Sequence, residues 1–225
     1  MFIGHYGVSL AAKRFAPRAS LGVFFLGAQL LDVLFAMFVL WGIEKLRIVP
    51  GFTKMNPYDL YSMPYSHSLI GSVLWSALGA LAFAALAKRA IPDAKERVAA
   101  ALAFAVVVLS HFVLDVPVHT PDLPLGFDPD TAKIGLGLWN QPDIAVVMEL
   151  GILVAGGALY LGSTRPREGG EAATRVTAGI LILLTIATPF LPTPGGPASF
   201  AAQALAGYAA LAALAEWMDR KRSVV

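Results

Sequence analysis

The sequence contains no cysteine among its 225 residues. This absence excludes disulfide bonds, thiolate metal sites, iron–sulfur clusters and cysteine nucleophiles, so any metal must be held by histidine and carboxylate groups. Charged residues are also scarce, at 14% of the chain, whereas a soluble globular domain carries about 25%. With 57% hydrophobic residues and a mean hydropathy of +0.67, the composition predicts an integral membrane protein.

Two further features are missing from the sequence. It has no internal repeat, which argues against an inverted-repeat transporter. The charges near its start, Lys13, Arg14 and Arg18, follow the first apolar stretch instead of preceding it, so no cleavable signal peptide is expected. The net charge of +2 is explained by basic residues that flank apolar spans, and nucleic-acid binding is not expected.

Long apolar segments are abundant. A bilayer crossing takes about 20 apolar helical residues, and six segments approach that length. A shorter apolar stretch, 2–16, predicts a helix running from mid-membrane or the outer side to the cytoplasmic face, or alternatively an amphipathic helix on the inner surface. We expect one all-α transmembrane domain over 1–225, in which 1–162 carry the site and 175–218 add two structural spans. The expected spans are 20–43, 67–87, 98–117, 142–162, 175–191 and 199–218.

The basic residues predict the orientation of the bundle. Of the 17 Lys and Arg residues, 13 fall in segments on one side of the expected spans, which the positive-inside rule makes cytoplasmic. The C-terminus then lies in the cytoplasm, and the segments 44–66 and 118–141 face outward. Segment 118–141 is rich in Pro, Gly and Asp and is either a lid over a site or an ordinary loop.

Ionisable residues at membrane depth are costly and are therefore candidates for a functional site. Counted at about 1.5 Å per helical residue from the nearest cytoplasmic charge, most of them fall in one layer of the outer half of the membrane. The inner segments 78–87, 98–109 and 152–161 contain none. A conduit needs polar groups along its whole path, so this distribution favours an outward-facing enzyme or binding site over a transporter. The layer contains His5, Asp32, His111, Asp115 and Glu149, with His67 and His119 at its rim.

The strongest local motif pairs His111 with Asp115. Four residues apart on a helix, the two side chains can reach one metal ion or one water molecule. The alternative is a structural pair whose members neutralise each other inside the bundle. Pro117 predicts that the helix ends near Val116, which places His119 at the rim of the site.

The other candidates have weaker local patterns. Asp32 must be protonated, paired or bound to a metal, and no Lys or Arg lies at its depth. Ser66 is expected to cap the second long helix, with His67 in its first turn facing either the site or interfacial water. Glu149 is a ligand, a general base or a protonated packing residue. His5 takes part only if the first short helix stands upright.

These residues resemble a known family. Gly4-His5, Asp32, Tyr65-Ser-His-Ser-Leu69 and Ser110-His111 with Asp115 are similar to the YdjM-like proteins of the bacterial inner membrane, which are described as membrane-bound metal-dependent hydrolases. The similarity spans about residues 1–160. It implies that His5, Asp32, His67, His111 and Asp115 are metal ligands, and it includes a distant likeness to the helical zinc-dependent phospholipase C proteins. The family often has a Pro-Asp-x-Asp-like cluster where this chain has Asp32 alone, which lowers the implied number of ligands and leaves open whether one metal or two is bound.

Residues and resemblance together predict a metal-dependent hydrolase in the bacterial inner membrane, with its site toward the outer side. The expected substrate is an ester or phosphoester of a lipid or lipid-linked molecule, and the expected divalent metal is zinc. Asp115 and Glu149 are the catalytic candidates, with Glu149 as the base for water activated at the metal. The alternatives are a non-catalytic metal- or lipid-binding protein, acting as a sensor or assembly factor, and a proton-coupled transporter.

Overall fold

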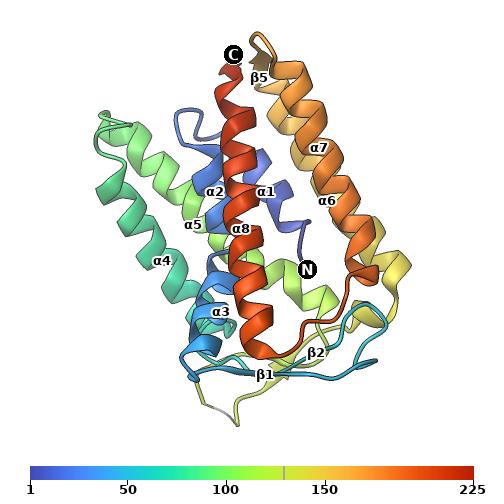
Figure 1. The fold of residues 1–225 in the computed structure, drawn as a ribbon. Coiled ribbons are helices and arrows are strands. Elements are labelled where there is room, and N and C mark those ends of the chain that lie inside the picture. The colour runs from blue at the N-terminus through green and yellow to red at the C-terminus, as the bar shows by residue number, and fades with distance from the viewer. Residues whose placement is uncertain (129) are drawn as a thin grey trace.

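The computed structural model describes residues 1–128 and 130–225. It is an all-helical bundle, as predicted, in which the long helices run side by side (Figure 1). Its elements are α1 (His5–Ala12), α2 (Leu21–Ala28), α3 (Leu30–Leu40), β1 (Lys45–Ile48), β2 (Tyr58–Ser62), α4 (Leu69–Leu86), α5 (Ala94–Val118), β3 (Leu123–Pro124), β4 (Lys133–Ile134), the 3-10 helix η1 (Leu138–Asn140), α6 (Pro142–Gly162), β5 (Thr164–Pro166), α7 (Gly170–Ala187), the 3-10 helix η2 (Thr188–Phe190), α8 (Pro197–Arg220) and β6 (Arg222–Val224).

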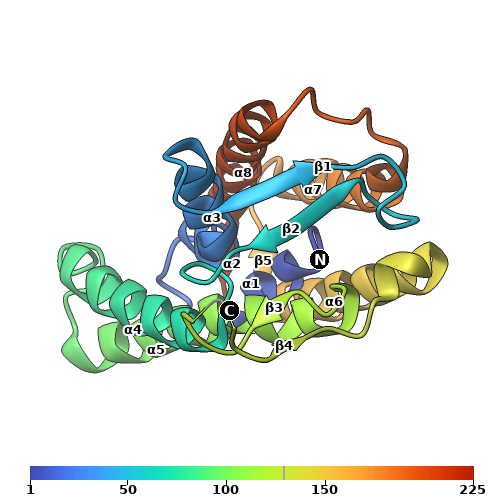
Figure 2. The same ribbon diagram turned by 90° about the horizontal axis from the view of Figure 1, so that it is seen from below.

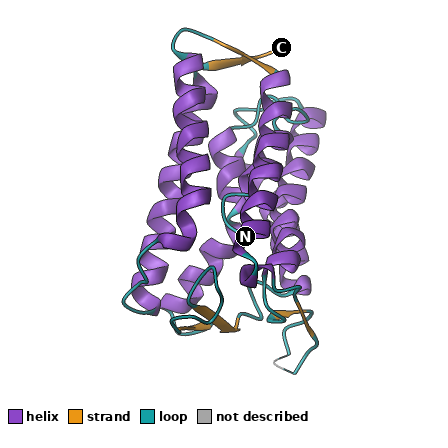
Figure 3. Cartoon of the chain, turned by 90° about the vertical axis from the view of Figure 1, so that its right-hand side faces the viewer, coloured by secondary structure: helices purple, strands orange, loops and turns teal. Residues whose placement is uncertain are grey.

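The two ends of the bundle differ. The antiparallel pair β1 and β2 lies across one end, which we call the hairpin end (Figure 2). The opposite end carries the antiparallel pair β5 and β6 and the chain's C-terminus (Figure 3). Because most basic residues of the chain flank the helices there, we call it the basic end.

The long helices have the length and composition of membrane spans. Within the described residues, α4, α5, α6, α8 and α7 extended through η2 are each long and apolar enough to cross a membrane. The expected first span is not one straight helix, because α2 and α3 meet at a bend of 56°. The backbone leaves the helical region at Gln29, whose side-chain amide donates a hydrogen bond to the Phe2 carbonyl at 3.1 Å. Taken together, α2 and α3 are still long and apolar enough to form one broken span, which gives up to six crossings within the described residues.

Helix α1 stands inside the bundle. His5 and Tyr6 are fully buried, and the helix starts midway along the bundle and points toward the basic end (Figures 1 and 3). It packs closely on α6, where a Cβ added to Gly156 would lie only 1.9 Å from the Gly7 carbonyl oxygen. The upright short helix is therefore confirmed, and the alternative of a helix on the membrane surface is wrong.

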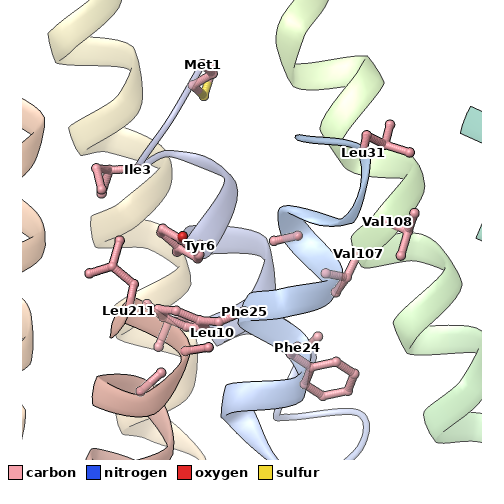
Figure 4. Packing of buried hydrophobic residues seen from close by; sticks show 14 of the residues in the cluster. Met1, Ile3, Tyr6, Leu10, Phe24, Phe25, Leu31, Val107, Val108 and Leu211 are labelled. Atoms are coloured by element: carbon pink, nitrogen blue, oxygen red, sulfur yellow. The ribbon is translucent and has the colours of Figure 1, made fainter. Parts of the chain in front are cut away.

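Apolar side chains fill the centre of the bundle and also cover its outside. Around α1 and α2, Tyr6 stacks on Phe25 with ring centroids 4.3 Å apart, and Leu211 of α8 lies beside them (Figure 4). On the outer faces, Leu81 and Leu86 of α4 are 69% and 85% exposed. Such a surface would promote aggregation in water, but it suits contact with lipid tails.

A buried polar cluster at the basic end joins α1, α6, α7 and α8. Lys13 forms an ion pair of 2.5 Å with Asp219, which also accepts a hydrogen bond of 3.0 Å from the Tyr160 hydroxyl. Arg222 donates to Thr174 at 2.9 Å. These contacts hold the basic ends of the last helices together.

Candidate metal centre

Four histidines and two aspartates converge in the interior of the bundle, at the hairpin-end side of α1. The histidines are all buried, with at most 3% of each residue exposed. These six residues come from four separate parts of the chain, which the fold brings together. His5 comes from α1, Asp32 from α3, His67 from the turn before α4, His111 and Asp115 from α5, and His119 from the residue that ends α5.

The two aspartates organise the cluster into two overlapping groups. Asp115 lies 3.2 Å from His5 Nε2 through Oδ1 and 3.1 Å from His111 Nε2 through Oδ2. Asp32 Oδ1 lies 3.3 Å from His67 Nε2 and 3.7 Å from His111 Nε2. In each group, one potential ligand atom per residue lies within 4.8 Å of the others, a spacing that could hold a metal ion. His111 belongs to both groups.

The prediction that the helix ends near Val116 is wrong, whereas His119, which follows α5 directly, belongs to neither of the two potential metal groups among the described residues. Helix α5 continues through Pro117 to Val118, and the His119 amide donates to the Asp115 carbonyl at 2.9 Å. Pro117 has no amide to bond the Val113 carbonyl, yet the last turn of the helix is retained. His111, Asp115 and His119 therefore lie on one face of the helix, and His119 Nε2 is 3.5 Å from Asp115 Oδ2.

Contacts at the other ring nitrogen orient the histidines. His111 Nδ1 lies 2.6 Å from the carbonyl oxygen of Ala28, at the break between α2 and α3. His119 Nδ1 lies 2.9 Å from Asp122 Oδ1. Because a carbonyl and a carboxylate only accept hydrogen bonds, Nδ1 is the donor in both cases. The Nε2 atoms are left facing the aspartates, which is the arrangement that orients histidine ligands at metal sites.

His67 is oriented through a serine and a glutamate. The Ser66 hydroxyl donates to Glu44 Oε2 at 2.5 Å, and its oxygen lies 2.8 Å from His67 Nδ1. Glu44 Oε1 accepts from the amides of Tyr65 at 2.7 Å and Ser66 at 2.9 Å. Burial raises the pKa of the Glu44 carboxyl, and the hydrogen bonds from Ser66 oppose that shift. Sequence reasoning missed Glu44, because an acid in an outer loop has no local signal that separates it from a solvated side chain.

The predicted cap of the second long helix is also wrong by two residues. Ser68 caps α4 by accepting a hydrogen bond from the Gly71 amide at 3.0 Å, and His67 precedes the helix. Ser66 is thereby left to contact Glu44 and His67.

The last two spans also contribute to the site. The Tyr208 hydroxyl of α8 donates to Asp32 Oδ2 at 3.0 Å. The expectation that 175–218 form purely structural spans is therefore wrong at this position. A tyrosine in an apolar helix has no sequence pattern that would have indicated this contact.

Glu149 anchors the start of the chain. Its Oε2 accepts from the Gly4 amide at 3.0 Å, and both of its oxygens lie 3.3 Å from the Phe2 amide. The same segment places the Met1 amino group 2.6 Å from Asp115 Oδ1 and the Met1 carbonyl 3.1 Å from His5 Nε2. The geometry gives Glu149 a role in positioning α1, and its role as a base remains a prediction.

The donor set fits a divalent cation. The Asp32 and Asp115 carboxylates share one buried site, and the Met1 amino group, 2.6 Å from Asp115 Oδ1, offsets part of their charge. A divalent cation held between the carboxylates and His111 Nε2 would offset the rest. His111 Nε2 is fully buried and makes no hydrogen bond within the described residues. Histidine nitrogen and carboxylate oxygen are also donors that zinc takes in proteins. The buried cluster could therefore hold a metal ion.

A cavity of about 650 Å³ adjoins the cluster. Its hairpin-end wall includes Met55, Tyr58 and Leu60 from the β1–β2 hairpin. The segment 118–141 contributes Trp139, whose ring centroid is 4.2 Å from that of His119. Both outer segments predicted from the sequence thus contact the space beside the cluster.

Comparison of the chain with protein-family models, with curated proteins and with solved structures finds no match in any of the three.

Proposed function

We propose that this chain is a membrane-embedded metal-dependent hydrolase that cleaves an ester or phosphoester of a lipid or lipid-linked substrate. The observation that carries the proposal is the convergence of the His5, Asp32, His67, His111, Asp115 and His119 side chains beside the cavity. The resemblance to the YdjM-like family implies the same class of activity. In this proposal the metal is zinc, the membrane is the bacterial inner membrane, and the hairpin end faces outward.

The cavity is what favours an enzyme over a protein that only binds a metal. Its volume of about 650 Å³ lies in the usual range for ligand sites, about 300–1,000 Å³. Asp32, His67, Asp115 and His119 line it directly. A substrate in this space would touch the side chains that hold the metal.

The chemistry follows from which charges the site contains. A bound divalent metal supplies a Lewis acid that polarises the scissile group and makes water a better nucleophile. No Lys or Arg side chain lines the cavity among the described residues, and the Met1 amino group there is paired with Asp115. Positive charge for a phosphoryl group would therefore come from the metal. In this proposal Asp115 and Glu149, which both line the cavity, accept a proton from water.

Hydrolysis assays on mixed micelles test this proposal. Detergent-purified protein is incubated with a bacterial lipid extract that contains phospholipids, and released headgroups and acyl chains are measured by mass spectrometry. We expect turnover that is lost on chelation, restored by zinc and lost in His111→Ala. Ser110→Ala is the matched control, because Ser110 is the neighbouring residue and its hydroxyl bonds only the Val107 carbonyl.

Three results of this assay would count against the proposal. Turnover that survives chelation would contradict a metal-dependent reaction. An equal loss of turnover in Ser110→Ala would mean that the effect of His111→Ala comes from a disturbed helix and not from the missing imidazole. Bound metal without turnover on any lipid fraction would favour the non-catalytic metal-binding alternative.

A further inference from the structure

The cavity extends from the cluster into the space between α7 and α8. Helix α7 contributes Ile180 and Leu184, and Thr188 follows directly after it. These positions are four residues apart, so they share one face of the helix. That face lines the cavity, and Leu184 on it also packs against the core of the bundle.

Helix α8 supplies the opposite wall. Gln203, Gly207, Ala210 and Leu214 all line the cavity, and their spacing places them along one side of the helix. The wall from Gln203 to Leu214 is about 16 Å long at a rise of 1.5 Å per residue. The cavity is therefore elongated along the bundle axis.

The lining changes in character along this wall. Tyr208 marks the level of the cluster, because its hydroxyl bonds Asp32. Toward the hairpin end, the polar side chains of Gln203 and Thr188 lie among apolar ones such as Phe200 and Leu191. Toward the basic end, α8 presents Ala210, Leu211 and Leu214, all of them apolar.

The two helices are held together at the basic end. There a Cβ on Gly170 would lie 2.2 Å from the Lys221 carbonyl oxygen, and Arg222 donates to Thr174. Toward the hairpin end the two ribbons separate (Figure 1). Ile180 and Ala210 line the cavity and are also exposed. The cavity therefore reaches the side of the bundle, at a depth that lipid tails occupy in a membrane.

We propose that one acyl chain of the lipid substrate occupies the space between α7 and α8. The lipid enters sideways from the bilayer, its tail lies along Leu211 and Leu214, and its headgroup linkage reaches the His/Asp cluster. This inference rests on the proposed function and specifies its substrate as a lipid of the leaflet at the hairpin end. A substrate without an acyl chain would leave the apolar part of the cavity in contact with water, which is unfavourable.

Two glycines provide a matched test. A Cβ added to Gly207 or to Gly179 meets no atom within 4 Å, so both helices accept a larger residue. Gly207 lines the cavity, whereas Gly179 lies on α7 outside the lining. Gly207→Leu therefore fills the proposed acyl-chain site, and Gly179→Leu is a control with the same substitution in the neighbouring helix.

The probe is a phosphatidylglycerol with a diazirine at the end of one acyl chain, in phosphatidylethanolamine–phosphatidylglycerol liposomes that contain the purified protein. After illumination, labelled residues are mapped by mass spectrometry. We expect labelling at Leu184 and Leu214, reduced about tenfold in Gly207→Leu, equal to about 1.4 kcal/mol of lost binding. Labelling in Gly179→Leu should match the wild type.

Labelling confined to lipid-facing residues such as Leu183, which is 65% exposed, would overturn the inference. Labelling at Leu214 that is the same in Gly207→Leu and in the wild type would overturn it as well. Metal content is measured on the same samples, so that the two proposals can fail separately. Bound metal without cavity labelling refutes the acyl-chain site alone, and cavity labelling without metal supports that site while refuting the metallohydrolase.

Discussion

Replacing Gly156 by alanine should push α1 away from α6. The new Cβ would lie 1.9 Å from the Gly7 carbonyl oxygen, whereas ordinary contact begins at 3.4 Å, so the helices must move apart by about 1.5 Å. Backbone atoms form this contact, and no flexible side chain can turn aside. Overpacking of this kind costs about 1–3 kcal/mol. His5 moves with α1, and its 3.2 Å approach to Asp115 is lost.

The assay is unfolding of the purified protein in mixed nonionic detergent and dodecyl sulfate, followed by tryptophan fluorescence. We expect the free energy of unfolding to fall by about 1–3 kcal/mol in Gly156→Ala, together with the metal content. Gly157→Ala is the control, because a Cβ there meets nothing within 4 Å. Alanine is also less flexible than glycine in a helix, so this variant should gain about 0.5–1 kcal/mol of stability. Equal stability of the two variants would refute the close packing of α1 on α6.

Three further predictions concern the metal centre and the basic end. Ser66→Ala should weaken metal binding about 10–100-fold in competition with a chromophoric chelator, because it releases His67. Ser68→Ala should leave metal affinity unchanged and lower stability by about 1 kcal/mol as a lost helix cap, and the reverse pattern would contradict the assigned hydrogen bonds. Lys13→Ala leaves Asp219 without its ion-pair partner and should cost about 3–5 kcal/mol in the same unfolding titration; a neutral effect would show that this pair does not hold the basic end together. Chelation should lower the unfolding temperature of the wild type but not of His111→Ala, since only a folded site binds the metal.

The long apolar segments and the all-helical character of the bundle could be predicted from the sequence. Apolar length is a property of each segment alone, and it identified all six regions. Counting depth along the spans also placed His5, Asp32, His111 and Asp115 in one layer, and the structure brings these residues together. Such counting succeeds because helices in a membrane are nearly parallel and rise by a constant amount per residue.

The features that were missed depend on contacts between distant segments. The break at Gln29 is accompanied by a hydrogen bond to Phe2 and by the contact of Ala28 with His111, neither of which leaves a local pattern. The hydroxyl of Tyr208 reaches an aspartate 176 positions away. Pro117 predicts a helix end near Val116, but α5 continues to Val118.

Metal content is the most direct test of the account. Elemental analysis of the detergent-purified, tag-free protein should find at least about one equivalent of a divalent metal per chain, with zinc as the expected metal. The metal should be lost in His111→Ala and in Asp32→Asn, and retained in Glu171→Gln, whose side chain is exposed at the basic end. A wild-type protein that binds no metal, even after reconstitution with zinc, manganese and iron, would contradict the metal centre and leave the histidines and aspartates as a structural or proton-linked cluster.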